Sequence, residues 1–212
     1  MHPRRLARIG GALYLILIAI GLWGEMFVRD RLIVSRDPKT TAANILAHES
    51  LWRSHIAAEL FLLICATVLL LILYDLLRAV NERLALLMVF FNLVSIAIEA
   101  VITLDLVRVL FLLNEPSQLS ALLKAHAYGF GVSLLFFGGF CIVIGYLIFK
   151  SGFFPKAIGV LMQIAGVCYA INTFALIVSP PLANVLFPAI LVPSLIGELS
   201  LCLYLLVKGV RS

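Results

Sequence analysis

Ionisable side chains stand inside the long apolar stretches of this sequence. They are Glu25, Glu59, Glu99, Asp105, Arg108, His126 and Glu198, and Asn172 adds an amide group. At the centre of a bilayer each charged group costs about 2.5–3.5 kcal/mol, so such groups pair with one another or serve a function. A histidine among carboxylates is suited to proton transfer or to metal binding.

The spacing of these residues predicts which of them share a helix face. His55 and Glu59 are four residues apart, so both can reach one site or one metal ion. With His126 they are the weak metal candidates. The sequence has no HExxH, GxSxG, Walker, CxxC or EF-hand motif, so it identifies neither a metal nor a cofactor.

Span three carries two polar faces. Asn92, Ser95 and Glu99 follow one another at helical spacing, and we expect them to lie on one face. Arg108 is nine residues beyond Glu99, about half a turn around the helix, so it cannot join that face. We expect Arg108 to pair with Asp105 and to reach outward.

The composition excludes most classes of protein. Of 212 residues, 63% are apolar and 13% charged, and the mean hydropathy is +1.13. Soluble domains are about half apolar and a quarter charged, which excludes soluble enzymes, nucleic-acid-binding domains, coiled coils and disordered chains. The net charge of +5 does not indicate nucleic acid as a partner, because Lys and Arg flank the apolar segments. The sequence predicts an all-α polytopic transmembrane bundle, one domain over residues 1–212.

Six stretches are long enough to cross a bilayer core of about 30 Å, which needs roughly 20 apolar helical residues. They are Leu6–Val28, Trp52–Leu77, Leu84–Leu113, Leu119–Phe149, Ala157–Val178 and Val185–Val207. Pro188 and Pro193 fall in the last one, whose first half should be kinked. No A-x-A site follows the first apolar stretch, which we interpret as a retained span rather than a removed signal peptide.

The distribution of Lys and Arg predicts the orientation. Nine of them, including Arg211, flank the side of the two termini, and six flank the other side. Because basic residues favour the cytoplasmic side, we expect both termini in the cytoplasm.

Residues 29–51 are then an extracytoplasmic segment with a short amphipathic helix. Asp37 is a good N-cap followed by Pro38 at the first helical position, and Thr40–Glu49 continues the helix. Its apolar members Ala42, Ile45 and Leu46, with Leu51, are expected at the membrane surface. This segment is either an ordinary connector or a lid over an outward-facing cavity.

The polar groups also sort by depth. With this orientation, nearly all of them fall in the outer half of the membrane, although separate spans contribute them. This predicts a polar cavity open to the outer face, with ligand-binding candidates Glu25, Glu59, Glu99, His126, Asn172 and Glu198. The alternative is that each group is a structural clip between helices.

Glycines recur every seven residues in the fourth span. Gly131, Gly138, Gly145 and Gly152 therefore line one helix face, and Gly159 and Gly166 do the same in the fifth span. Small residues let helix backbones approach closely in lipid, so these stripes predict helix–helix packing surfaces.

Several short motifs carry a family resemblance. They include the opening Arg8-Ile-Gly-Gly-Ala-Leu-Tyr14, the run Glu25-Met-Phe-Val-Arg29-Asp-Arg-Leu-Ile33, the stretch His126-Ala-Tyr-Gly129 and the closing Ile196-Gly-Glu-Leu199. With them the whole chain resembles a family of bacterial six-helix membrane proteins catalogued as a domain of unknown function. The resemblance implies a multi-pass protein of a bacterial inner membrane and implies no activity.

Three functions stay open from the sequence. The first is binding or transport of a small amphiphile or lipid in the polar cavity, with membrane lipid as the surroundings. The second is an intramembrane enzyme acting on a lipid-like substrate, with His126 as general base or metal ligand. The third is a structural or accessory membrane subunit.

Overall fold

A computed structural model describes residues 3–209 of the 212-residue chain, and Arg211 lies outside the described residues. This part of the chain is helical and has no strand. The long helices are α1 (Pro3–Trp23), α4 (Glu49–Leu77), α5 (Glu82–Val109), α6 (Pro116–Ser151), α7 (Lys156–Val178) and α9 (Val192–Val207). Short elements join them: the π-helical turn η1 (Gly24–Arg29), α2 (Asp30–Leu32), α3 (Pro38–Ala47), α8 (Pro180–Leu186) and the 3-10 turn η2 (Ala189–Leu191).

Six continuous helical stretches within residues 3–209 are long and apolar enough to cross a membrane. The first joins α1, η1 and α2, and the last joins η2 and α9. The protein is therefore an all-α, multi-pass membrane protein, which confirms the predicted fold class.

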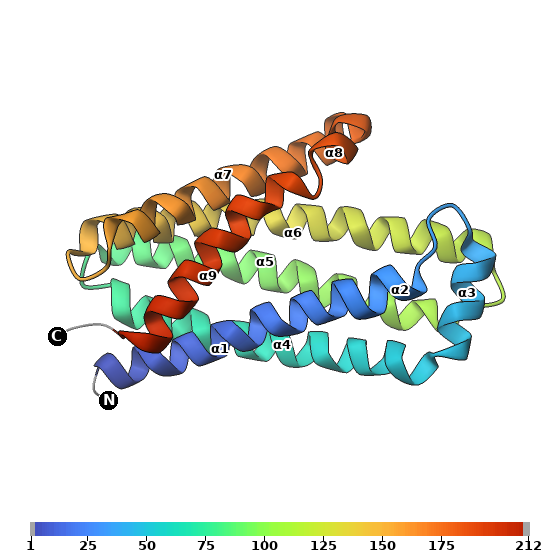
Figure 1. Cartoon of the computed structure of the whole chain (residues 1–212), viewed down its shortest axis with the longest axis horizontal. Coiled ribbons are helices and arrows are strands. Elements are labelled where there is room, and N and C mark those ends of the chain that lie inside the picture. Colours follow the sequence, from blue (N-terminus) through green and yellow to red (C-terminus); the bar gives the residue numbers. More distant parts are fainter. Residues whose placement is uncertain (1–2, 210–212) are drawn as a thin grey trace.

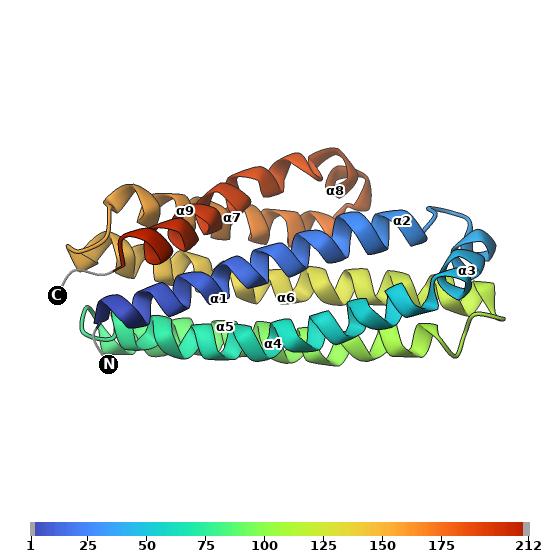
Figure 2. The same cartoon turned by 60° about the horizontal axis from the view of Figure 1, so that its bottom comes forward.

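The six long helices form a closed ring in chain order. Each packs against the next, and α9 returns to pack against α1 (Figures 1 and 2). Arg4 Nε lies 3.4 Å from the carbonyl oxygen of Lys208, so the first turn of α1 lies beside the end of α9. The largest core cluster of buried residues draws on all six helices, including Tyr14, Leu73, Met88 and Leu205.

The glycine stripes bring α6 and α7 close together. A Cβ atom added at Gly145 would lie 2.6 Å from the carbonyl oxygen of Gly159, and one at Gly138 would lie 2.8 Å from that of Gly166. Since real Cβ atoms do not approach backbone so closely, these positions admit only glycine at the present helix separation. The predicted packing surfaces are confirmed at these four positions.

Gly152 does not belong to the packing stripe. A Cβ atom there would meet nothing within 4 Å, and φ is +75°. The residue ends α6 in the left-handed conformation that glycine adopts without strain. Its place in the seven-residue repeat is explained by helix termination, so that part of the prediction is wrong.

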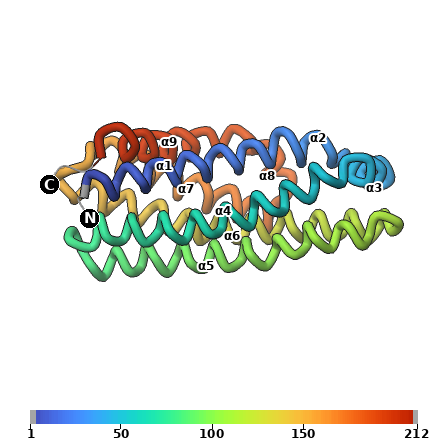
Figure 3. The backbone as a smooth tube through the Cα atoms, turned by 90° about the horizontal axis from the view of Figure 1, so that it is seen from below, coloured from blue at the N-terminus to red at the C-terminus, as the bar shows by residue number. Residues whose placement is uncertain are grey.

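The last span begins later than predicted. Val185 belongs to α8, and the chain breaks at Phe187–Pro188 before η2 and α9. Proline lacks the backbone N–H that would continue a helix, which accounts for the interruption. As a result α8 stops well short of the end of the bundle that carries α3 (Figures 1 and 3).

The other helices extend further and form a head at that end. α6 has 36 residues, or about 54 Å at 1.5 Å per residue, against about 30 Å for a bilayer core. The exposed side chains change from apolar to charged along these helices toward α3. The change lies between Phe61 and Arg53 on α4, between Leu104 and Arg108 on α5, and between Tyr128 and Lys124 on α6. We infer that residues 30–53 and 108–124, called the head below, project beyond the apolar layer.

α3 crosses the end of the head and packs on α2, α4 and α6 (Figure 1). Asp37 caps it as predicted, since the backbone N–H of Thr40 donates to Asp37 Oδ1 over 3.0 Å. Ala42 and Ile45 are buried in a second core cluster, so they do not lie on a membrane surface as expected. Leu46 is the exposed apolar member, at 62%.

Candidate functional site

One polar side chain from each of the six long helices lies in the interior of the ring. We call this set the inner polar cluster; it consists of Tyr14, Glu59, Glu99, Ser133, Tyr169 and Glu198. Its members are buried or partly buried. Because helices that follow one another in the chain are neighbours in the ring, residues up to 184 positions apart can meet there.

Glu198 on α9 is held by two phenols. The hydroxyl of Tyr14 donates to Glu198 Oε2 over 3.2 Å, and the hydroxyl of Tyr169 donates to Oε1. Neither tyrosine is basic, so the carboxylate is stabilised by hydrogen bonds without a salt bridge among the described residues. This triad joins α1, α7 and α9.

Glu99 on α5 is held by serine. Ser133 Oγ donates to Glu99 Oε1 over 2.6 Å and lies 3.0 Å from Ser95 Oγ. Asn92 and Ser95 are buried, and the predicted common face of Asn92, Ser95 and Glu99 is confirmed. Glu99 is also near enough to both Glu59 and Glu198 for their charges to interact, which links the cluster into one group.

A second group of polar side chains lies nearer the head. We call it the histidine cluster; it consists of Glu25, Arg29, His55 and His126. Its centre is His55, which is only 1% exposed. Both ring nitrogens of His55 are buried and have no hydrogen-bond partner among the described residues. Glu59 Oε1 is 3.8 Å from Nδ1, close enough for an ionic contact but too far for a hydrogen bond.

Three residues fix the ring of His55. The indole rings of Trp23 and Trp52 meet it edge to face, with centroids 6.2 and 6.1 Å away. Gly24 opens the π-helical turn, and a Cβ atom there would lie 2.7 Å from Cε1 of His55. π-helical turns are rare and occur often at functional sites. The imidazole can therefore approach η1 this closely because residue 24 is glycine.

Arg29 and Glu25, four residues apart, form an ion pair on η1. Arg29 Nε lies 3.0 Å from Glu25 Oε2, but their geometry gives an ion pair and not a hydrogen bond. The Glu25 side chain is 54% exposed, so it lies at the edge of the cluster. Arg29 is near enough to His55, Glu59 and His126 for charge interaction.

His126 on α6 is buried and anchored. Its Nδ1 lies 3.0 Å from the carbonyl oxygen of Ile102, which can only accept, so Nδ1 carries a proton. His126 and His55 are near enough for their charges to interact. The two histidines, from α4 and α6, thus belong to one region of the bundle.

The structure brings together most of the sequence candidates. Glu59, Glu99 and Glu198 are linked through the inner polar cluster. Arg29 pairs with Glu25 and is in range of charge interaction with His55 and His126. Within residues 3–209 no hydrogen bond joins Asn172 to either cluster. Asp105 and Arg108 pair at 2.8 Å where α5 enters the head, and the Arg108 side chain is 63% exposed there, as expected.

Sequence reasoning missed the aromatic members of the site. Tyr14 and Tyr169 were part of apolar runs, and their hydroxyls gave no signal until their helices were placed around Glu198. Trp23 lies inside the first predicted span, and Trp52 is the first residue of the second. A usable signal was the position of Trp52 three residues before His55, which puts both on one helix face.

Metal binding has little support from the geometry. In the described part of the chain no group of three or more His, Cys, Asp or Glu side chains is arranged to hold a metal ion. His55, Glu59 and His126, the weak metal candidates, do not form such a group.

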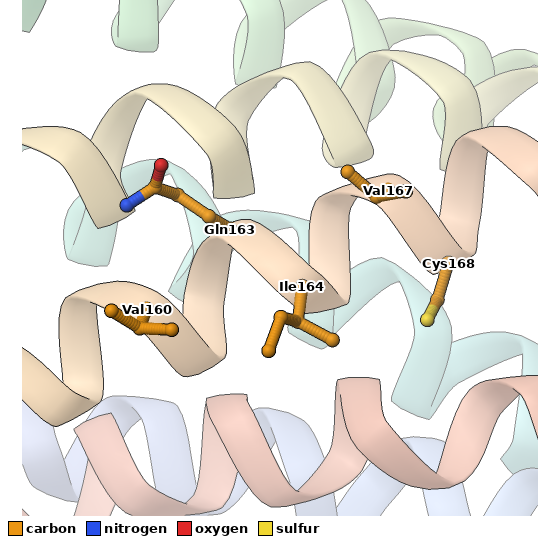
Figure 4. Close-up of a pocket in the computed structure, with 5 residues that line it drawn as sticks. All are labelled: Val160, Gln163, Ile164, Val167 and Cys168. Carbon is orange, nitrogen blue, oxygen red and sulfur yellow. The ribbon is translucent and has the colours of Figure 1, made fainter.

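Two surface pockets lie away from both clusters. One has a volume of about 300 Å³ and is lined by residues of α7, four of them apolar or thiol-bearing and one of them Gln163 (Figure 4). The other, about 480 Å³, is lined by α6, α7 and α8, with Ser179 among apolar residues. Neither pocket contains a predicted site residue.

Comparison of the chain with curated proteins and with solved structures gives no match. Comparison with protein-family models gives one match that spans nearly all of the described residues. It covers residues 9–209, and the chain belongs to the family described as Domain of unknown function (DUF4386).

Proposed function

We propose that the protein binds a small amphiphile or lipid, whose polar group lies between the histidine cluster and the inner polar cluster. His55 carries this proposal. Leaving buried polar atoms without partners costs about 1–3 kcal/mol for each group, which a bound ligand would recover. An amphiphile fits because the surrounding helices are apolar where they face the membrane.

The candidate ligand-binding residues are Glu25, Glu59, Glu99, His126 and Glu198, with His55 added from its geometry. Asn172 drops to a secondary candidate, since no hydrogen bond links it to the others within the described residues. The histidine cluster lies nearer the head than the inner polar cluster does, so the ligand would enter from the head half of the bundle.

The test is a search for bound amphiphiles in purified protein. Native mass spectrometry of the detergent-solubilised protein should show an adduct of lipid-like mass, and His55→Leu and Gly24→Ala should reduce its occupancy. Ser54→Ala is the matched control, because Ser54 neighbours His55 but is exposed. Equal occupancy in all four proteins, or no adduct with any added amphiphile, would contradict the proposal.

A second candidate function is catalysis on a lipid-like substrate. The pair His55–Glu59, separated by 3.8 Å, resembles a general base with its orienting carboxylate. Incubation with a membrane lipid extract should then give a new product by mass spectrometry, and His55→Gln should abolish it. If no variant changes binding or turnover and each only lowers stability, the polar groups are structural clips.

We also propose that the termini face the cytoplasm of a bacterial cell and that the head lies outside the inner membrane. The excess of Lys and Arg near the termini supports this orientation. Fusion of a periplasm-active phosphatase to the C-terminus should give an inactive reporter, whereas insertion of the reporter between Val34 and Arg36 should give an active one. The reverse pattern would refute the orientation.

A further inference from the structure

We propose that the polar group of the bound amphiphile is a protonated amine; this rests on the proposed function. The inner polar cluster contains three carboxyl groups, and Glu99 lies within range of charge interaction with both Glu59 and Glu198. Arg29 is the basic side chain in range of Glu59, and it already pairs with Glu25 at 3.0 Å. The interior is therefore rich in acidic groups and poor in cations, so a cationic ligand complements it.

His55 and Glu59 define where the amine would bind. A neutral imidazole has one nitrogen that accepts a hydrogen bond, and neither nitrogen of His55 has a partner in the described chain. A primary ammonium group has three N–H donors, so one can reach His55 while another reaches Glu59, only 3.8 Å from the ring. A hydrogen bond from a cation to a carboxylate is of the strong, charge-assisted type.

The aromatic residues fit the same ligand class. Trp23 and Trp52 flank His55, and indole faces are the best aromatic partners of cations. A sulfate or phosphate group without an amine would instead meet these carboxyl groups. Within the described residues the guanidinium in range is that of Arg29, which is in an ion pair with Glu25, although its Nε has no hydrogen-bond partner. The geometry thus disfavours purely anionic amphiphiles.

The test compares probes that share one alkyl chain. Purified full-length protein in nanodiscs of phosphatidylcholine is titrated with dodecylamine, dodecyltrimethylammonium, dodecanol and dodecyl sulfate, and each Kd and thermal midpoint is measured. Dodecylamine should bind most tightly and raise the midpoint in proportion to its concentration. Dodecyltrimethylammonium, which has no N–H donor, should bind more weakly, and dodecyl sulfate should not bind at the site.

Variants tie the binding to the named groups. Glu59→Gln should weaken dodecylamine binding about tenfold or more, because it removes a charge-assisted hydrogen bond. Glu99→Gln is the second test should Glu59→Gln fail to fold. Glu82→Gln is the control, since Glu82 is exposed in the first turn of α5 at the opposite end of the bundle.

The outcomes separate this inference from the proposed function. If dodecanol or dodecyl sulfate binds best and His55→Leu abolishes that binding, the site exists and the amine inference is wrong. If dodecylamine binds Glu59→Gln and Glu99→Gln as tightly as it binds the unmodified protein, the inference is also wrong. If no probe binds, both proposals fail. Nanodiscs made with phosphatidylethanolamine distinguish a lipid headgroup from a free amine, because a lipid ligand would then compete with dodecylamine.

Discussion

Removal of the Tyr169 hydroxyl should show how much the hydrogen bond to Glu198 contributes to the stability of the helix ring. Tyr169→Phe keeps the aromatic ring, which packs edge to face on Phe137 at 5.5 Å, and deletes only the donor to Glu198. A hydrogen bond to a charged group contributes about 1.5–3 kcal/mol. For a chain of this size each kcal/mol corresponds to about 2–4 °C, so the thermal midpoint should fall by roughly 3–12 °C.

A double-mutant cycle tests whether this loss comes from Glu198. Glu198→Leu removes both acceptor oxygens, so a subsequent Tyr169→Phe should cost almost nothing. The free energies are measured by denaturant-dependent unfolding of purified protein in mixed micelles, followed by tryptophan fluorescence and circular dichroism. Tyr128→Phe is the control, because the Tyr128 side chain is exposed.

Two outcomes of the double-mutant cycle would contradict this reasoning. Hydrogen bonds between membrane helices average only about 0.6 kcal/mol in double-mutant cycles, so a coupling at that level would mean that Glu198 acts as an ordinary neutral partner. An equal loss for Tyr169→Phe in both backgrounds would show that its hydroxyl does not act through Glu198 at all. Tyr14→Phe should give a smaller coupling, since its bond is longer at 3.2 Å.

Four further predictions concern packing and the head. Gly145→Ala should destabilise the protein by about 1–3 kcal/mol in the same unfolding assay, because its Cβ atom would meet backbone of α7. Gly21→Ala, where a Cβ atom would meet nothing within 4 Å, should be neutral or stabilising by up to about 1 kcal/mol. The hydrogen bonds from Thr40 lower the pKa of Asp37, so its stabilisation of α3 is complete above the unfolded value of about 3.9 and is lost as the pH falls through the lower folded value. The protection factors of the α3 amides, which correct for the pH dependence of intrinsic exchange, should therefore fall below that pH, and an Asp37→Ala variant should show low protection without the pH step. Trp52→Phe removes a buried hydrogen bond of 3.0 Å to the α5 backbone and should cost about 1–3 kcal/mol, with a local loss of amide protection in the head; unchanged protection would contradict the assigned role.

The sequence predicts where the helices of this protein begin and end better than it predicts which helices pack against one another. Apolar length and charged turns set five of the six spans to within a few residues, because a bilayer demands a fixed length of apolar helix. The sixth was placed too early at Val185, since the break at Pro188 separates two apolar helices that hydropathy alone reads as one.

The site was predictable in its charged members and not in its aromatic ones. Glu59, Glu99 and Glu198 stand out because a carboxyl group in an apolar helix is costly wherever it points. Tyr14 and Tyr169 do not stand out in the same way, because tyrosine is an ordinary residue of apolar helices. Only the ring arrangement, in which α9 packs against both α1 and α7, reveals that both hydroxyls reach Glu198. Likewise, the lack of hydrogen-bond partners for the two ring nitrogens of His55 among the described residues results from packing and cannot be predicted from the sequence.

The ring order has a consequence for the biogenesis of the protein. Neighbours in the ring are neighbours in the chain, so each emerging helix can dock on the one synthesised just before it. The contact between α9 and α1 is different, since it joins residues up to 204 positions apart and must wait for the last helix to be made. Tyr14 therefore spends nearly the whole of translation without Glu198, and a ribosome stalled before α9 would leave an unclosed bundle for the quality-control proteases of the membrane.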